Sequence, residues 1–411
     1  MKINKHCFPN GLRLVHYEDT STQMVALNIV YDVGARDEHP EHTGFAHLFE
    51  HLMFGGSAHI PDYDTPLQLA GGENNAWTNN DITNYYLTVP KPNIETAFWL
   101  ESDRMLELAF SEQSLEVQRG VVMEEFKQRC LNQPYGDVGH LFRPLAFRVH
   151  PYRWPTIGKE LSHIEQATLD EVKSFFYRFY APNNAVLAVT GNISWDETVK
   201  LTEKWFAPIP RRDVPVRQLP QEPEQTQERR LTVERNVPLD ALFMGYHMCS
   251  REGADYYAFD ILSDILSNGR SSRLNRRLVQ EQNIFSGIDA YISGTRDAGL
   301  LQISGKPAAG VSLEQAEAAV RKELEELQRS PVDGQELEKV KNKFESTQIF
   351  GNINYLNVAT NLAWFELTGK AEDIDLEVER YRSVTTEQLH TVAQRTFCES
   401  NVVVLYYKSD K

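Results

Sequence analysis

Two histidines with metal-ligand spacing lie near the N-terminus. Residues 44–57 read GFAHLFEHLMFGGS, in which His47 and His51 are four positions apart and Glu50 stands between them. On an α-helix, residues four apart lie one turn apart on the same face. Two imidazoles placed in this way can hold one Zn²⁺, which polarises a scissile carbonyl and lowers the pKa of its bound water toward ~7. The H-x-x-E-H order therefore predicts a hydrolytic zinc site at which a carboxylate takes the proton of that water, with Glu50 beside the ligands and not needed as one.

The alternative interpretation of this segment is a solvated helix with two chance histidines. Its apolar neighbours Leu48, Phe49 and Leu52 favour a buried helix instead. Buried imidazoles and carboxylates need polar partners, because burial without them costs free energy. A bound metal supplies such a partner.

A catalytic zinc normally has three protein ligands and a water, so one ligand is still missing. The candidate segment is 111–129, a long helical pattern with adjacent Glu124 and Glu125. Adjacent helical residues point about 100° apart, so only one of the two can face the metal. The spacing alone does not choose between them.

The composition of the 411-residue chain is that of a globular protein, with 41% hydrophobic and 24% charged residues. A formal net charge of −16 argues against a nucleic-acid partner, since proteins that bind nucleic acid carry basic surfaces. The four cysteines are far apart and form no C-x-x-C pair, so the sequence suggests neither a thiol redox motif nor a cysteine-based zinc site.

No stretch of the sequence approaches the ~18 apolar residues of a membrane span. The first residues also lack the apolar region of a signal peptide. We therefore expect a cytoplasmic protein, or a periplasmic or organellar one if a targeting segment has been removed.

The sequence contains two diverged copies of one pattern. The matching segments are 25–38 with 241–255, and 168–192 with 385–409. The first match pairs Tyr31 with Tyr246 and the second pairs Asn184 with Asn401, so the offsets are 215 and 217 residues. Their agreement within two residues predicts a duplicated domain.

A proline-rich stretch separates the two copies. Five prolines between 208 and 230 remove backbone donors and favour an extended linker. We expect a first domain at 1–207 with the zinc site, a linker at 208–230 and a homologous domain at 231–411. Each copy mixes strand and helix patterns, which predicts an α+β fold of two homologous domains, each a mostly antiparallel sheet with helices on one face.

The second copy has lost every candidate ligand. At an offset of 215 residues from His47, Glu50 and His51 it has Leu262, Ile265 and Leu266. We therefore expect one zinc ion per chain.

The motifs GARDE…GFAHLFEHLMFGGS, NNAWTNNDITNYY and VVMEE, with the duplication, resemble the pitrilysin/insulinase-type zinc peptidases over essentially the whole chain. This family includes the mitochondrial processing peptidases, and the chain resembles their single-half bacterial relatives. The resemblance implies half of a clam-like shell that encloses a chamber together with a second half.

The resemblance also assigns the site residues. It implies that His47 and His51 are zinc ligands and that Glu50 is the general base. It identifies Glu125 as the third ligand, with Glu124 as a flanking or supporting residue. The family usually has a glutamate seven residues before the third ligand, where this chain has Gln118, so the tuning of the metal should be weaker here.

The segment 71–89 has a turn-rich middle between two strand patterns, which predicts a hairpin. The resemblance implies that Asn75, Ala76 and Trp77 lie on an exposed edge strand to which a peptide substrate adds as a further strand. The alternative is an ordinary hairpin with Trp77 in the core.

In many family members the second half of the shell supplies an arginine and a tyrosine to the active site. The matching positions here are Val279 and Ser286, which cannot serve, although Arg276 or Arg277 could replace the cation if the alignment shifts. We therefore expect a dimer, with a heterodimer whose homologous partner supplies the pair favoured over a homodimer.

The sequence as a whole predicts a zinc-dependent endopeptidase that acts on peptides or unfolded segments. The competing function is a non-catalytic scaffold or assembly subunit of the same fold. Such subunits typically have lost part of H-x-x-E-H, whereas this chain keeps the motif intact.

Overall fold

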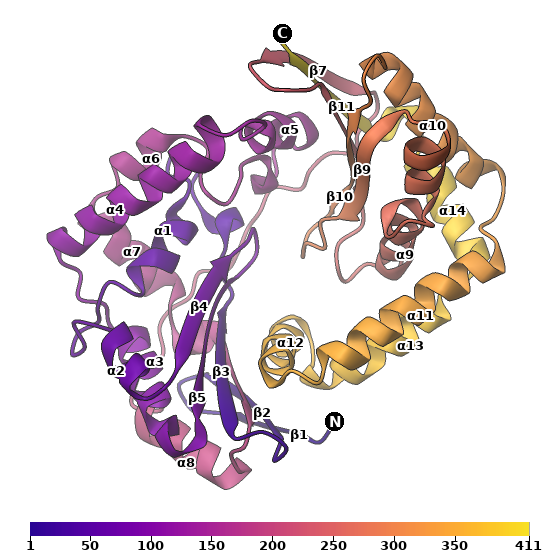
Figure 1. Ribbon diagram of the computed structural model, residues 1–411. Coiled ribbons are helices and arrows are strands. Elements are labelled where there is room, and N and C mark those ends of the chain that lie inside the picture. The colour runs from indigo at the N-terminus through magenta and orange to yellow at the C-terminus, as the bar shows by residue number, and fades with distance from the viewer. Residues whose placement is uncertain (411) are drawn as a thin grey trace. The chain divides into compact units, whose positions relative to one another are not determined.

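The computed structural model describes residues 1–410, which form two compact units, each built on one β-sheet (Figure 1). The first unit comprises residues 1–131, 154–220 and 349–376. The second comprises residues 132–153, 221–348 and 377–411, and its last residue, 411, lies outside the described residues. The predicted α+β class is confirmed.

The sheet of the first unit has six strands in the order β1-β2-β6-β3-β5-β4, and only β2 and β6 are parallel. The strands are β1 (Ile3–Cys7), β2 (Arg13–Glu18), β3 (Met24–Tyr31), β4 (Glu73–Thr78), β5 (Thr83–Pro90) and β6 (Ala185–Gly191). The helices of this unit are α1 (Phe45–Leu52), α2 (Asp64–Leu69), α3 (Ile94–Leu106), α4 (Glu112–Phe126), α6 (Leu161–Glu165), α7 (Leu169–Phe179), α8 (Trp195–Trp205) and α12 (Tyr355–Thr368).

The sheet of the second unit has five strands in the order β7-β11-β8-β10-β9, with only β7 and β11 parallel. The strands are β7 (Arg229–Arg235), β8 (Ala241–Met248), β9 (Phe285–Ile292), β10 (Gly299–Pro307) and β11 (Val402–Ser409). The helices are α5 (Val138–Ala146), α9 (Tyr256–Ser267), α10 (Leu313–Arg329), most of α11 (Gly334–Gly351), α13 (Glu377–Ser383) and α14 (Thr386–Thr396).

The two sheets repeat one topology. The order β2-β6-β3-β5-β4 corresponds strand by strand to β7-β11-β8-β10-β9, including the single parallel pair. The paired asparagines make the same bonds: the Asn184 amide donates to the carbonyls of Phe179 (2.8 Å) and Asp32 (3.1 Å). The Asn401 amide donates to the equivalent carbonyls of Thr396 (3.0 Å) and His247 (3.1 Å). This correspondence supports a duplication.

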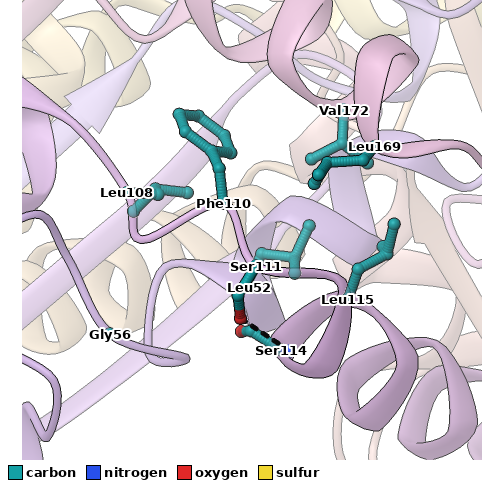
Figure 2. Close-up of a pocket in the computed structure, with 9 residues that line it drawn as sticks. All are labelled: Leu52, Gly56, Leu108, Phe110, Ser111, Ser114, Leu115, Leu169 and Val172. Atoms are coloured by element: carbon teal, nitrogen blue, oxygen red, sulfur yellow. Dashed lines mark hydrogen bonds between the residues drawn. The ribbon is translucent and has the colours of Figure 1, made fainter.

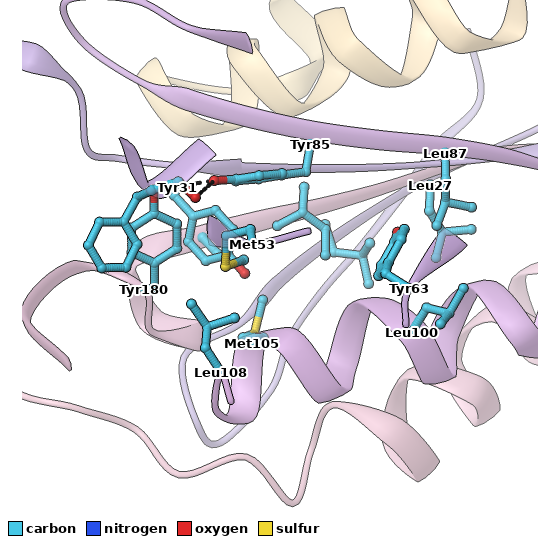
Figure 3. Close-up of a cluster of buried hydrophobic side chains, with 14 of the residues drawn as sticks. Leu27, Tyr31, Met53, Tyr63, Tyr85, Leu87, Leu100, Met105, Leu108 and Tyr180 are labelled. Atoms are coloured by element: carbon cyan, nitrogen blue, oxygen red, sulfur yellow. Dashed lines mark hydrogen bonds between the residues drawn. The ribbon is translucent and has the colours of Figure 1, made fainter. Parts of the chain in front are cut away.

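Most helices of the first unit cover one face of its sheet, where the largest core lies. Figure 3 shows part of this core, in which Tyr31, Tyr85 and Tyr180 lie close together and the hydroxyls of Tyr85 and Tyr180 are 3.4 Å apart. Strand β3 alternates between two buried faces, because Leu27 and Ile29 join this core while Ala26 and Val30 face the other way.

A single helix covers the second face of each sheet. In the first unit this helix is α12, whose Val358 and Leu362 pack against strands β2, β3 and β6. In the second unit it is α5, whose Phe142 packs with Val403 and Leu405 of β11. Each unit therefore takes most of its residues from one of the sequence-expected domains and one covering helix from the other.

The chain between the two sheets is extended, since residues 210–226 contain no helix or strand. The boundary between the units, after Pro220, falls within the expected linker at 208–230. Within residues 1–410, no helix combines the length and apolar character needed to cross a bilayer.

Candidate metal centre

Helices α1 and α4 bring three metal-binding side chains together. The His47 Nε2 and the His51 Nε2 lie 3.6 Å and 3.3 Å from the Glu125 Oε2. Their ligand atoms all lie within 4.8 Å of one another, and no other such group of histidine, cysteine or acidic residues occurs among residues 1–410. A tetrahedral zinc with ordinary bond lengths separates its ligand atoms by roughly 3.3–3.5 Å. The donor set and its spacing fit zinc.

Glycines precede and follow helix α1 at points where a side chain would meet neighbouring atoms. Its N-cap Gly44 has φ +88°, and a Cβ there would lie 2.8 Å from the Ile157 carbonyl oxygen. After the helix, Gly55 lies against Ser114 of α4, where a Cβ would be only 2.5 Å from the hydroxyl. The absence of a side chain at Gly55 lets the chain after α1 approach α4 closely.

The environment of His47 favours the neutral imidazole that a metal needs. Burial lowers the pKa of His47 to about 4, an effect that the neighbouring carboxylate of Glu125 opposes. Its Nδ1 atom is buried and has no hydrogen-bond partner. A neutral imidazole keeps a nitrogen lone pair for a metal at neutral pH.

Glu50 is the half-buried carboxylate beside the two histidines. Burial raises the pKa of Glu50, whereas the Thr78 hydroxyl and His51 lower it. Thr78 is the last residue of β4. A carboxylate whose pKa is raised towards neutrality is a better proton acceptor and donor in catalysis.

The two adjacent glutamates of α4 point in different directions. The Glu125 side chain is only 19% exposed and faces the histidines. The Glu124 side chain is 57% exposed and lies 3.8 Å from the ammonium of Lys127. The structure thus brings Glu125 to the histidines and leaves Glu124 at the surface.

One residue that the sequence analysis missed contacts the centre. An Nη of Arg129 lies 2.9 Å from the Glu125 Oε1, so the two carboxylate oxygens have different partners. Arg129 lies in a π-helical turn, Lys127–Leu131, that follows α4. The spacing of four residues between Glu125 and Arg129 could have predicted this contact, because oppositely charged residues four apart on a helix are neighbours.

Gln118 is half-buried, two turns before Glu125 on α4. Its Cγ lies near Gly55, three residues after the end of α1. It therefore belongs to the contact between the two helices that carry the candidate ligands.

The expected hairpin of residues 71–89 is present as strands β4 and β5. Strand β4 is at the edge of its sheet and is paired on one side only, with β5. Ala76 packs towards the face that carries α1, and Trp77 packs towards α12 on the opposite face. Asn75 is exposed, and its Oδ1 accepts the N–H of Ala76 at 2.8 Å.

A small hollow lies behind the contact of α1 with α4 (Figure 2). Its walls are mostly apolar, including Leu52, Leu115 and Val172, and its only polar side chains are Ser111 and Ser114. None of the candidate ligands lines it. The hollow therefore offers no group for acid–base or metal chemistry.

The second copy has no comparable centre. Leu262, Ile265 and Leu266 on α9 are fully buried in the core. Val279 is part of that core's edge, and the exposed Ser286 donates its hydroxyl to the Lys306 carbonyl at 3.1 Å.

The two arginines near Val279 are engaged in ion pairs. Arg277 is paired with Glu323 and Glu326, and Arg276 lies 3.5 Å from Glu281.

Two family models match the chain. One described as Insulinase (Peptidase family M16) matches residues 13–137, which include all the candidate ligands. The other, described as Peptidase M16 inactive domain, matches residues 166–344. The second match contains the copy of the helix that has no ligands.

A relative and a solved structure that are similar to this chain are both described as proteases. The zinc protease PqqE of Helicobacter pylori is 29% identical over 338 residues, which cover 81% of this chain and 76% of that protein. A crystal structure of a protease from Helicobacter pylori is 26% identical and covers 99% of both chains, with a TM-score of 0.94.

A longer protein contains the same fold in about half of its length. The periplasmic protease PqqL from Escherichia coli matches 99% of this chain with a TM-score of 0.81 and 18% identity. The match covers 47% of the PqqL chain.

Proposed function

The chain belongs to the insulinase (M16) peptidase family, and from this premise we propose that it is a zinc-dependent endopeptidase. Its substrates are peptides or unfolded segments. His47, His51 and Glu125 hold one Zn²⁺ per chain, and Glu50 is the general base.

The observation that carries this proposal is the convergence of two imidazoles and one carboxylate from helices far apart in the sequence. When bound there, zinc would supply Lewis-acid activation of a water and of the scissile carbonyl. Glu50 takes the proton of that water and passes it to the leaving amine, a role that its raised pKa supports. Glu124 is a flanking surface residue in this proposal.

The edge strand β4 is the proposed substrate-binding element. A peptide that pairs with the free edge of β4 would be held by main-chain hydrogen bonds, which suits an enzyme that reads backbone rather than sequence. Asn75, Ala76 and Trp77 are the contact positions. Because Thr78 follows them and influences the pKa of Glu50, the same strand reaches from the proposed binding positions to the proposed base.

The active enzyme is proposed to need a second chain. The PqqL chain is about twice as long as the part that this chain matches, which is consistent with two such halves in that protein. We propose that a homologous partner supplies the arginine and tyrosine that Val279 and Ser286 do not provide, and that the two chains enclose a chamber. A homodimer is the alternative, and a weakly active or non-catalytic scaffold subunit is the competing function.

The test of the site compares Glu50→Gln with Glu124→Gln. We expect Glu50→Gln to retain one zinc per chain and to lose peptide hydrolysis by at least about 100-fold, because the amide cannot accept the proton. Glu124→Gln should retain both properties. Full hydrolysis by Glu50→Gln would contradict the assignment of the base.

The test of the partner compares the lone chain with a mixture that contains a homologous chain carrying the arginine and tyrosine. Loss of one transition-state donor costs about 10²–10³ in rate, so the lone chain should be feeble and the mixture active. Strong hydrolysis by the lone chain, unchanged in the mixture, would contradict the need for a partner.

A further inference from the structure

A buried carboxylate lies at the N-terminus of helix α1. The Glu38 Oε2 accepts the N–H of Gly44 at 2.9 Å, and its Oε1 accepts the N–H of Ala46, also at 2.9 Å. Glu38 is 7% exposed and stands in the GARDE segment, which has no role in the proposed reaction. Its two oxygens thus bond two of the backbone donors that a helix start leaves unpaired.

Helix α1 has no capping side chain at its own N-cap position. The helix is eight residues long, and its N-cap is Gly44, which has no side chain to accept a hydrogen bond. His47 is the third residue of the helix, so it lies in the turn that frays first. A loss of order in that turn would move a candidate ligand.

The second copy is an internal control for this interpretation. With the offset of 215 residues that pairs Tyr31 with Tyr246, Glu38 corresponds to Gly253. Helix α9 begins at Tyr256, four residues earlier in this alignment than α1, and it forms without a carboxylate at the position of Glu38. Instead, the Gly253 backbone carbonyl accepts the N–H of Tyr256 at 3.0 Å. The second copy thus starts its helix at an earlier position and without the glutamate, and the copy that lacks the glutamate also lacks the ligands.

The burial of Glu38 is costly by itself. Burial raises the pKa of Glu38 to about 8, although the hydrogen bonds from Ala46, Gly44 and Trp154 oppose this rise. A buried carboxylate needs such bonds to offset its desolvation. The second copy has Gly253 at the corresponding position and carries no such cost there.

We propose that Glu38 is a positioning residue for the metal centre: by holding the N–H groups of Gly44 and Ala46, it fixes the first turn of α1 and with it the imidazole of His47 before zinc binds. This inference rests on the proposed function in taking His47 as a zinc ligand.

The test measures zinc affinity of the full chain by competition with a chromophoric chelator at neutral pH. Loss of a helix cap corresponds to about a 2- to 30-fold loss of binding when the helix must order on binding, which is the decrease expected for Glu38→Gln. The matched control is Glu171→Gln, because Glu171 caps α7 of the same unit by accepting the N–H of Thr168 at 2.9 Å. Glu171→Gln should bind zinc as the wild type does.

A second measurement follows amide hydrogen exchange of residues 44–47 in the zinc-free chain. Glu38→Gln should accelerate exchange in this turn and leave α7 unchanged, and zinc should restore protection. Glu38→Asp, which keeps the charge on a shorter side chain, serves if the glutamine variant does not fold.

The outcomes separate this inference from the proposed function. Equal zinc affinities of wild type, Glu38→Gln and Glu171→Gln, or exchange that rises equally in α1 and α7, would overturn the inference while leaving the proposed function intact. A wild-type chain that binds no zinc would overturn the proposed zinc site and the proposed effect of Glu38 on zinc affinity. Amide hydrogen exchange of residues 44–47 would still show whether Glu38 orders the first turn of α1.

Discussion

The two copies of the fold carry different residues on one helix. Helix α1 places His47, Glu50 and His51 at positions where α9 has Leu262, Ile265 and Leu266, all fully buried. The topology and the asparagine bonds at Asn184 and Asn401 are the same in both copies. The comparison shows that this fold accepts apolar residues at these positions. The polar residues of α1 are therefore not required for folding, which is consistent with a chemical role.

The copies are alike in how their sheets are completed. Helix α12 belongs to the C-terminal half of the sequence and covers the first sheet, whereas α5 belongs to the N-terminal half and covers the second. Each sheet therefore depends on a helix from the other half of the sequence.

The largest expected effect comes from weakening these covering helices. Leu362→Ala in α12 should lower the free energy of unfolding of the first unit by about 2–5 kcal/mol, and Phe142→Ala in α5 should lower that of the second by about 3–5 kcal/mol. Both side chains are almost fully buried. Hydrogen exchange of the strands under each helix measures the effect unit by unit.

Val216→Ala is the control for these variants, since Val216 is 87% exposed and its loss should change stability by less than about 0.5 kcal/mol. If Leu362→Ala leaves the amide hydrogen exchange of β3 and β6 unchanged, α12 does not stabilise the first sheet.

The next prediction concerns pH and the zinc-free chain. The pKa of His47 is lowered to about 4 by burial, below the ~6.5 of a histidine in an unfolded chain. Between these values the unfolded chain binds a proton that the folded chain does not. The free energy of unfolding should therefore fall as the pH is lowered from about 6.5 towards 4, with no further loss from this group below that range.

Urea unfolding of zinc-free wild type and His47→Gln across this range measures that contribution. The variant should lose less stability on acidification, because it has no imidazole to protonate. An identical fall in both proteins would show that His47 is not held neutral by the fold.

A smaller effect is expected at Arg129. Removing a group that orients a metal ligand typically weakens metal affinity 10- to 100-fold, so Arg129→Met should bind zinc more weakly by about that factor. Lys127→Met is the matched control, because Lys127 lies on the same turn and contacts Glu124 instead of Glu125. Chelator competition measures both, and equal affinities would mean that Arg129 does not orient Glu125.

The smallest effect is expected at Gln118. Gln118→Glu introduces a negative charge in the helix that carries Glu125, and a partly solvated charge contributes about 0.2–1 kcal/mol. Zinc affinity should rise by no more than about fivefold. A weaker affinity in this variant would show that the amide makes a contact that the carboxylate cannot.

The sequence predicts much of this fold because its signals are local. The strand and helix patterns, the hairpin at 71–89 and the pairing of Asn184 with Asn401 all follow from residues close to one another or from an internal repeat. The packing of α5 and α12 on the sheet of the other half of the sequence does not follow in this way. An apolar helix pattern indicates that one face of the helix is buried, but not against which sheet.

The candidate site shows the same limit. The spacing of His47 and His51 is local, so the sequence predicts their shared face. The spacing left Glu124 and Glu125 equivalent, since only the packing of α4 on α1 decides which of them faces the histidines. The contacts of Arg129 with Glu125 and of Glu38 with α1 depend on tertiary structure in the same way.

Anomalous X-ray scattering at the zinc edge, from crystals of the full chain grown with zinc, tests the central claim most directly. The account predicts one peak per chain, bonded at about 2.0–2.2 Å to nitrogens of His47 and His51 and to an oxygen of Glu125. The absence of a peak between α1 and α4, a peak bonded to Glu124, or a peak in the second unit would contradict it.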